Sequence, residues 1–201
     1  MNAFRVVAEF EKAVAEYAGS GHAVAVDCCT SAIFLSLKLQ QELGFRAGEI
    51  TCPARTYASV PMAIIHAGFR VRFEDFDWKG VYQLKPLPIF DGAKRFKRGM
   101  YQGGLHCLSF HTKKILNIGR GGMILTDSAE HAAWLRKARY DGRAEKPYPE
   151  ERIETLGWHC YMMPDQAARG LMLLNALPDD NEDLEEDYPD LRKMPVFARA
   201  A

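Results

Sequence analysis

Charged side chains follow two apolar segments of the chain, at points where a buried strand would end. Lys113 and Lys114 are adjacent in a polar loop after one segment, and Asp91 ends another. A lysine amine that points into a site is a nucleophile, although most adjacent lysines are solvated surface. A carboxylate at the end of a buried strand is costly without a partner, and Lys94 or Arg95 would supply one as a simple ion pair. Each signal is therefore weak when it is taken alone.

Two further strand ends carry side chains suited to an anion and to an aromatic ring. Thr30 and Ser31 follow the apolar run 22–26 and open a predicted helix, whose free N–H groups and dipole attract an anion such as phosphate. The same two residues also suit an ordinary helix cap. Tyr57 follows the apolar run 49–54, where an aromatic side chain either stacks on a planar ligand or simply packs.

These four signals together match the requirements of one cofactor, pyridoxal phosphate. This cofactor needs a cradle for its phosphate and an aromatic side chain against its ring. It also needs an acid beside its pyridine nitrogen and a lysine that forms a Schiff base. The combination therefore predicts a site for pyridoxal phosphate, although no single residue does so.

Apolar periodicity predicts the elements that position these side chains. Because strands alternate with helices along the first part of the chain, we expect an α/β fold, a three-layer αβα arrangement with a mostly parallel sheet. Ligands bind at the carboxyl ends of the strands in such sheets, which is where the four signals lie. Helices are expected at 4–17, 30–43, 58–68, 128–140 and 164–177, and strands at 22–26, 49–54, 70–77, 81–84, 86–91, 105–110 and 122–127.

Composition limits the classes of protein and of partner. The chain has 201 residues, 48% of them hydrophobic, which is enough for one well-buried domain. It has 26 basic and 26 acidic residues, without the long basic run or basic–aromatic stripe that nucleic-acid binding needs. No apolar run approaches the ~20 residues of a membrane helix, and the charged N-terminal segment does not resemble a signal peptide.

The cysteines indicate a reducing compartment. There are five, at irregular spacing and without a C-x-x-C pair, which favours buried thiols over disulfides or a metal site. We therefore expect a cytoplasmic protein.

The end of the chain differs in composition from the rest. Residues 179–201 hold 8 acidic and 3 basic residues, so this segment carries a block of like charge. Such blocks bury little apolar surface and are typical of disorder. We expect one domain over 1–177 and a disordered acidic tail over 178–201.

Several motifs, in order along the chain, resemble the DegT/DnrJ-type sugar aminotransferases, which are fold type I pyridoxal-phosphate enzymes. "FEKAVAEYAGSGHAVAVDCCTSAI" is similar to the family's opening helix, first strand and phosphate-binding turn, and "PIFDGAKRF" to its cofactor aspartate segment. "LSFHTKKILNIGRGGMILTD" is similar to its lysine loop, in which Ser-Phe-His, two variable residues and a lysine precede Gly-x-Gly-Gly. Counting from the serine selects Lys114 rather than Lys113 as the reactive lysine.

The resemblance implies a role for each matching residue. Lys114 forms the Schiff base and, once released, moves a proton between two carbons. Asp91 holds the proton on the pyridine nitrogen. The residues that it implies for cofactor binding are Thr30, Ser31, Tyr57, Asp91, Lys94, Ser109 and Lys114. The implied reaction moves an amino group, commonly from glutamate, onto a nucleotide-linked keto sugar, in a homodimer whose sites are completed by the partner.

The chain departs from the family pattern at several points. Cys29 replaces a glycine before the phosphate turn, and Lys94 stands where glutamine or histidine is usual. Tyr161 takes a position from which the family often reaches the neighbour's site with arginine or asparagine, so it is our cross-subunit candidate. Compared with the family pattern, we expect a shortened segment at 78–88 and a small C-terminal domain that is largely missing.

Three functional hypotheses remain open on these residues. The first is a compact aminotransferase of this family that acts on a nucleotide-linked sugar. The second is a catalytically weak or inactive cofactor-binding remnant that serves as a binding or partner protein. The third is a different pyridoxal-phosphate reaction on a smaller amine.

Overall fold

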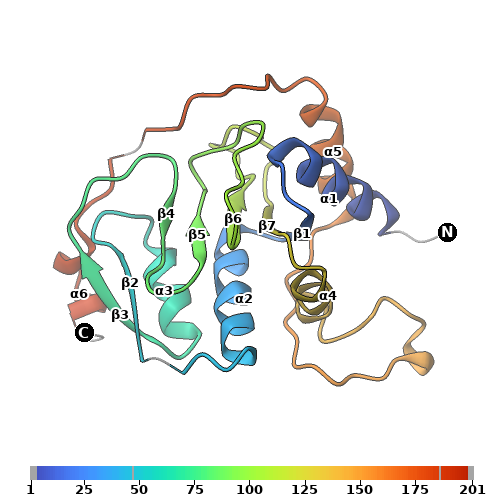
Figure 1. The fold of residues 1–201 in the computed structure, drawn as a ribbon, viewed down its shortest axis with the longest axis horizontal. Helices are drawn as coiled ribbons and strands as arrows, with labels where there is room; N and C mark the ends of the chain where they lie inside the picture. Colours follow the sequence, from blue (N-terminus) through green and yellow to red (C-terminus); the bar gives the residue numbers. More distant parts are fainter. Residues whose placement is uncertain (1–3, 47, 186, 199–201) are drawn as a thin grey trace.

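The structure is a computed structural model of the chain, and it describes residues 4–46, 48–185 and 187–198 (Figure 1). Helices and strands alternate along its first half, as the periodicity predicts. In chain order the elements are α1 (Arg5–Ala18), β1 (His22–Val26), α2 (Cys29–Glu42), β2 (Glu49–Pro53), α3 (Ser59–His66), β3 (Arg70–Glu74), β4 (Tyr82–Gln83), β5 (Ile89–Asp91), β6 (Leu105–Ser109), β7 (Gly122–Thr126), α4 (Ala129–Ala138), η1 (Tyr148–Glu150), α5 (Pro164–Leu174), η2 (Leu191–Lys193) and α6 (Pro195–Ala198).

The strands form a five-stranded sheet in the order β1-β7-β6-β5-β4 and a separate parallel pair, β2-β3. Within the larger sheet only β5 and β6 pair in parallel, and the other three neighbouring pairs are antiparallel. The expectation of a mostly parallel sheet therefore needs refinement. The reason is that β7 runs backwards between β1 and β6, which themselves point the same way, and β4 folds back on β5 as a hairpin.

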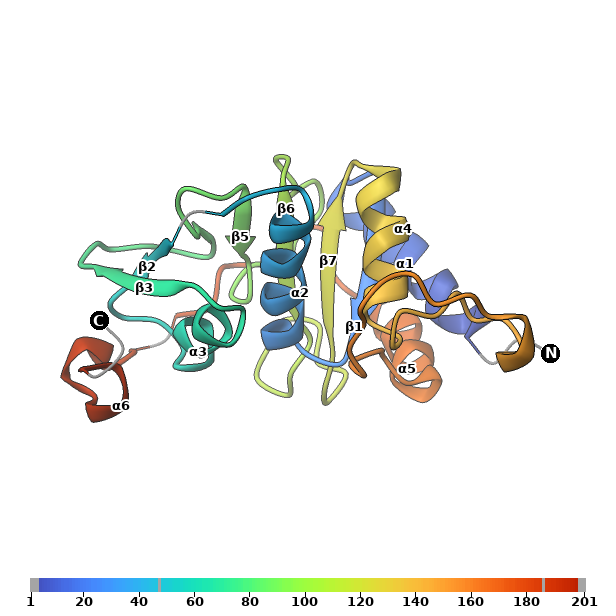
Figure 2. The same cartoon turned by 90° about the horizontal axis from the view of Figure 1, so that it is seen from below.

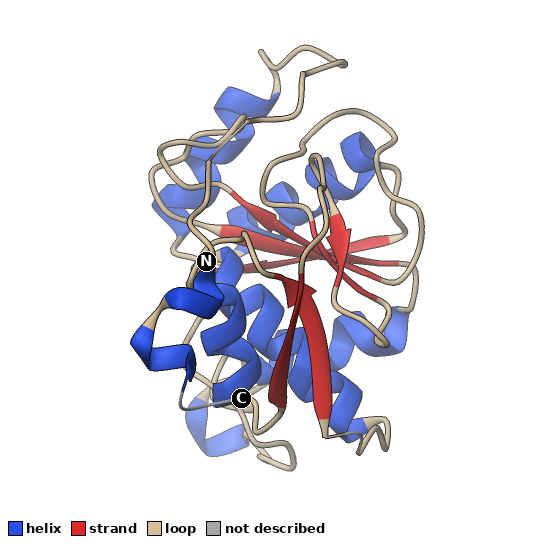
Figure 3. Cartoon of the chain, turned by 90° about the vertical axis from the view of Figure 1, so that its left-hand side faces the viewer, coloured by secondary structure: helices blue, strands red, loops and turns tan. Residues whose placement is uncertain are grey.

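Alternating side chains divide the sheet into two faces, each covered by helices (Figures 2 and 3). Val24 and Ile124 pack into one core cluster with α2, α3 and α4, whereas Ala25 and Met123 pack into a second cluster with α1 and α5. In Figure 2, α2 lies across one face of the sheet, and α1 and α5 lie near its β1 edge. This arrangement is the three-layer αβα architecture that the sequence predicts.

Strand direction determines where the polar strand ends meet. Because β1, β5 and β6 run the same way, their carboxyl ends lie at one edge of the sheet. The chain leaves β1 there and enters α2 through Cys28. A Cβ on Gly122 would lie 2.4 Å from the carbonyl carbon of Cys28, so only glycine lets β7 pass this turn so closely.

A buried carboxylate joins α1 to the sheet and to α4. Glu11 is 3% exposed and accepts hydrogen bonds from the Ala25 N–H at 2.9 Å and from Arg136 Nε at 3.0 Å. It also pairs with Arg139, which is 4% exposed. Through these contacts the Glu11 carboxylate connects α1 to β1 and to α4.

We expect Glu11→Ala to destabilise the protein by about 3 kcal/mol, because it leaves the buried Arg139 guanidinium without its main partner. Arg139 retains a longer contact with Glu145 at 3.6 Å, which limits the loss. Equilibrium unfolding in urea measures the change. Glu9→Ala is the control, because Glu9 forms an exposed ion pair with Arg5 on the same helix and should change stability by no more than about 0.5 kcal/mol. Equal effects of the two substitutions would contradict this account.

The C-terminal segment differs from the disordered tail that its charge suggests. Leu191 is 2% exposed and Phe197 is 3% exposed, and Asp183 pairs with Arg95 of the domain body. The described residues of 178–198 therefore pack on the rest of the chain. Basic side chains of the domain pair with the acidic residues of this segment, and its isolated apolar side chains are buried. The overall composition of the segment reveals neither of these contacts.

Among the described residues, no helix combines the length and the apolar character needed to cross a membrane.

Candidate functional site

A cavity of about 690 Å³ opens at the edge of the sheet where β1, β5 and β6 end. Its walls come from the β1–α2 turn, the β2–α3 loop, the end of β5, the β6–β7 loop and the C-terminal segment. The residues that line it are Cys28, Cys29, Thr30, Ile33, Thr56, Tyr57, Ala58, Ser59, Val60, Trp78, Asp91, Ala93, Lys94, Ser109, His111, Lys113, Lys114, Arg120, Tyr188, Pro189 and Leu191. Six of the eight predicted site residues are in this set.

The β6–β7 loop presents its two lysines differently. Both line the cavity, but Lys113 is exposed and Lys114 is partly buried. The backbone N–H of Lys114 donates to the carbonyl oxygen of His111 at 2.9 Å, so a tight turn fixes its direction. Burial raises the pKa of Asp91, and among the nearby charged groups Lys114 opposes this shift most. Burial and electrostatics thus agree with the motif in favouring Lys114.

Asp91 is a buried carboxylate whose two oxygens are oriented by neighbours. It is 5% exposed, and it accepts from the Ala93 N–H at 2.9 Å and from the Tyr82 hydroxyl at 2.6 Å. Burial raises the pKa of Asp91, and these hydrogen bonds and the nearby lysines only partly oppose the shift. The carboxylate therefore favours a cationic partner at the cavity wall.

The start of α2 lies at the cavity, as expected for an anion site. Thr30 lines the cavity and donates to Ser59 Oγ at 2.8 Å, and Ser109 lines it from the end of β6. Ser31 lies elsewhere: its N–H and hydroxyl contact Cys28 Sγ at 3.5 and 3.3 Å, so it completes the helix cap behind the cavity wall. The predicted phosphate role of Ser31 lacks this geometric support.

Aromatic side chains surround the remaining predicted residues of the cavity. Tyr57 is 63% exposed, and its ring centroid lies 6.4 Å from that of Tyr188. Lys94 is 6% exposed, and its Nζ lies 4.6 Å from the ring centroids of both Trp78 and Tyr188. Such contacts stabilise a cation through the ring quadrupoles.

Tyr161 belongs to a different region. Its ring lies 5.5 Å from Phe4, 5.1 Å from Tyr140 and 4.8 Å from His159, measured between centroids. Its backbone forms a bridge to Val26, so it lies beside β1 and not among the residues that line the cavity. A contribution to a neighbour's site stays a prediction.

Sequence reasoning missed Trp78, Tyr82 and Tyr188. Tyr82 supports Asp91 from within the edge strand β4, and its apolar surroundings gave no polar signal. Trp78 and Tyr188 approach Lys94 from segments with no periodic pattern. The sequence feature that could have indicated a buried or contacting role for Tyr188 is its position as an aromatic residue within an acidic segment.

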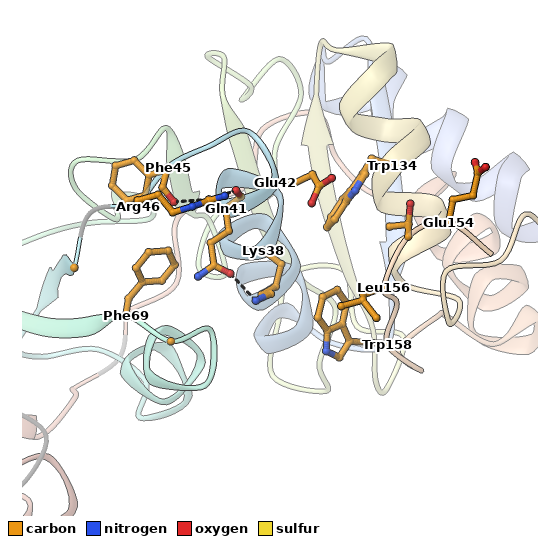
Figure 4. A pocket seen from close by; sticks show the side chains of 13 residues that line it. Lys38, Gln41, Glu42, Phe45, Arg46, Phe69, Trp134, Glu154, Leu156 and Trp158 are labelled. Atoms are coloured by element: carbon orange, nitrogen blue, oxygen red, sulfur yellow. Dashed lines mark hydrogen bonds between the residues drawn. The ribbon is translucent and has the colours of Figure 1, made fainter.

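A second cavity of about 640 Å³ lies beside the C-terminal end of α2 (Figure 4). Two of its basic side chains are paired within it: Lys38 donates to Gln41, and Arg46 donates to the backbone at Gln41 and Phe45. Among its lining residues no buried carboxylate faces a lysine, as Asp91 does in the first cavity. The first cavity is therefore the stronger candidate for chemistry.

The model of the DegT/DnrJ/EryC1/StrS aminotransferase family matches residues 2–89 and 97–192, which is most of the chain. The chain belongs to this family. The matched ranges include the lysine loop, whereas residues 90–96, which hold most of the aspartate segment, lie between the two ranges.

Two curated relatives show how much of a family member this chain spans. The spore coat polysaccharide biosynthesis protein SpsC of Bacillus subtilis is 28% identical over 90% of this chain and 59% of its own length. The GDP-perosamine synthase of Caulobacter vibrioides is 27% identical over 87% of this chain and 58% of its own length. The chain therefore spans less than two thirds of these relatives.

A solved structure supports the fold. PseC of Helicobacter pylori, an aminotransferase involved in the biosynthesis of pseudoaminic acid, has a TM-score of 0.72 and 18% identity, over 85% of this chain and 57% of its own. The likeness confirms the fold expected from the resemblance, in which helices cover both faces of the central sheet.

Proposed function

We propose that this chain carries out the pyridoxal-phosphate-dependent transfer of an amino group, from glutamate, to a nucleotide-linked keto sugar. One observation carries the proposal: Lys114, Asp91, Thr30 and Ser109 line the same cavity, although they come from distant parts of the chain. Family membership and the sugar-related names of the relatives agree with it.

The cavity suits the cofactor in size and in chemistry. Its volume of about 690 Å³ lies within the range of small-molecule sites, roughly 300–1,000 Å³. The hydroxyls of Thr30 and Ser109 and the start of α2 offer donors to a phosphate. A buried carboxylate at Asp91 and an exposed aromatic at Tyr57 would face the pyridine nitrogen and the ring.

Each of the chain's residues then has a defined task. When bound, the cofactor supplies an electron sink for the pair left by loss of a proton from carbon. The Lys114 amine would hold the cofactor and, once the amino donor has displaced it, would move that proton between carbon atoms. The Asp91 carboxylate holds a proton at the ring nitrogen, and the resulting cation offsets the cost of burying this carboxylate. Tyr82 and Ala93 keep both of its oxygens in position.

Absorption spectroscopy tests the proposal. Purified protein mixed with pyridoxal phosphate should gain a visible band, and glutamate should then bleach the band as the amino group is transferred to the cofactor. Bleaching by small amines but not by glutamate would support the reaction on a smaller amine instead. A stable band that no amine bleaches would support a cofactor-binding remnant, and absence of the band would contradict all three hypotheses.

A homodimer is part of the same proposal. The family resemblance implies sites completed by a partner, and the aromatic cluster around Tyr161 is a candidate surface for this contact. Sedimentation velocity of the full chain, with and without cofactor, measures the oligomeric state. A monomer at all accessible concentrations would remove the dimer from the proposal.

A further inference from the structure

The C-terminal segment forms part of the wall of the proposed cofactor cavity. We define the strap as residues 179–185 and 187–194, which follow α5 and precede α6. In Figure 1 this segment runs from α5 along the top of the molecule and down towards α6. Tyr188, Pro189 and Leu191 of the strap line the cavity, together with Lys114 and Asp91. The strap is thus part of the cavity wall.

Aromatic contacts join the strap to other residues that line the cavity. The ring of Tyr188 is stacked with that of Trp78 at an interplanar angle of 15° and a centroid distance of 6.3 Å. Lys94 Nζ is 4.6 Å from each centroid, so the cation contacts both rings. Trp78 is itself fixed, because its Nε1 donates to the Arg55 carbonyl oxygen at 2.9 Å. Tyr188 therefore meets a preformed surface.

The first half of the strap is anchored through Asp183. Its carboxylate accepts two hydrogen bonds from Arg95, at 2.8 and 2.6 Å, and its side chain is 7% exposed. The domain body leaves space for this carboxylate, since a Cβ on Gly80 would lie 2.2 Å from Asp183 Oδ2. Backbone bonding continues the anchor, because the Leu184 N–H donates to the Lys94 carbonyl oxygen at 2.9 Å.

The second half is anchored near the β2–α3 loop. The Leu191 N–H donates to the Ala54 carbonyl oxygen at 2.9 Å. Arg192 bridges Asp190 of the strap and Asp75 of the body, with Nη2 at 2.7 and 2.8 Å from the two carboxylates. Asp75 also pairs with Arg55. The strap is therefore held on both sides of Tyr188.

We propose that the strap is the roof of the cofactor cavity and that Tyr188 is the positioning residue that holds this roof closed over Lys94. The identity of the ligand beneath the roof rests on the proposed function, whereas the roof itself does not. Ion pairs carry much of the anchoring and several are exposed to solvent, so salt should weaken it. A bulky reagent or ligand then reaches the part of the cavity beneath the strap faster when the strap is displaced.

Thiol labelling tests the roof without any cofactor. Cys28 and its neighbour Cys29 both line the cavity and are partly exposed, whereas Cys52, Cys107 and Cys160 are buried, so labelling at Cys28 is distinguished from labelling at Cys29 by peptide fragmentation. A maleimide that must pass the strap should modify Cys28 roughly tenfold faster in Asp183→Asn, the factor expected when one charged hydrogen bond that holds the closed state is lost. The labelled peptide is identified by mass spectrometry.

Tyr188→Ala is a second variant, which leaves the ion pair of Asp183 with Arg95 in place. The roof can therefore be tested even if Asp183→Asn folds poorly. Tyr188→Ala should label Cys28 faster, and Tyr188→Phe, which retains the ring, should label more slowly than Tyr188→Ala. Glu9→Gln is the control for loss of an ion pair, because Glu9 pairs with Arg5 on α1. Raising the salt concentration should speed labelling in the wild type.

The cofactor affinity gives an independent readout. The dissociation constant for pyridoxal phosphate should rise several-fold in Tyr188→Ala and rise less in Tyr188→Phe, which retains the ring. Faster labelling without any cofactor binding would support the roof and contradict the proposed function. Unchanged labelling of Cys28 in Asp183→Asn and in Tyr188→Ala would overturn the roof, whatever the affinity for the cofactor.

Discussion

Lys114→Ala should lower the rate of amino transfer at least about 10⁴-fold, since it removes both the nucleophile and the group that moves the proton. The visible band of the lysine-bound cofactor should be lost in the same variant. The protein should still fold, because Lys114 is only partly buried and lies in a loop. Stopped-flow absorption after mixing with glutamate measures the rate, and circular dichroism measures folding.

Lys113→Ala is the matched control for this prediction. The two lysines are neighbours that line the same cavity, but Lys113 is exposed. Its removal should leave the visible band in place and change the rate by less than about tenfold, as expected for a solvated charge near a binding site. The assignment fails if the band survives in Lys114→Ala, or if it disappears in Lys113→Ala.

The positions of the catalytic candidates were predictable because they depend on local patterns. Strand 22–26 is observed with the expected bounds, and most other elements end within a few residues of the expectation. Asp91 and Ser109 fall at strand ends because apolar runs stop there. Parallel directions of β1, β5 and β6 then bring these ends together. Burial separates Lys113 from Lys114 in agreement with the motif.

The pairing of the strands was less predictable. Nothing in the run 122–127 indicates that β7 lies between β1 and β6 with reversed direction. A buried strand reads as a continuous apolar run in either direction, so periodicity does not determine its neighbours. The pairing of the short strand β4 was equally unpredictable, because the tight turn that follows β4 places it antiparallel to β5, and its own sequence does not.

The strap escaped prediction because its stability depends on contacts between distant residues. Arg95 and Asp183 are separated by 88 positions, and Gly80 makes space for their contact. A block of acidic residues predicts disorder only when the rest of the protein surface offers no basic side chains to pair with it. Similarly, Tyr82 became recognisable as a partner of Asp91 only once the hairpin placed its hydroxyl 2.6 Å away.

Asp91→Asn should reduce amino transfer on the order of 10²–10⁴-fold, which is the range for loss of a group that holds a proton in the reaction. An amide is close to the carboxylate in size but carries no negative charge for the pyridine nitrogen. Steady-state turnover with glutamate measures the loss. Asp127→Asn is the control. Asp127 follows β7, which runs opposite to β6, so it lies at the other edge of the sheet. Its carboxylate accepts a hydrogen bond from the Gly21 N–H at 2.9 Å. Equal losses in the two variants would contradict the role of Asp91.

The stability of Asp91→Asn should depend on pH in a direction fixed by burial. Because burial raises the pKa of Asp91, the folded state binds a proton at this carboxyl more tightly than the unfolded state does. Its contribution to stability is complete below the ordinary aspartate range and is lost as the pH rises through the folded pKa. Asparagine does not titrate, so the free energy of unfolding of the variant, relative to wild type, should increase between about pH 4 and pH 7. Urea unfolding of the cofactor-free proteins at both pH values measures this difference. A decrease over the same range would mean that Lys114 and the hydrogen bonds of Tyr82 and Ala93 outweigh burial, and the carboxylate would then be stabilised without any cationic ligand.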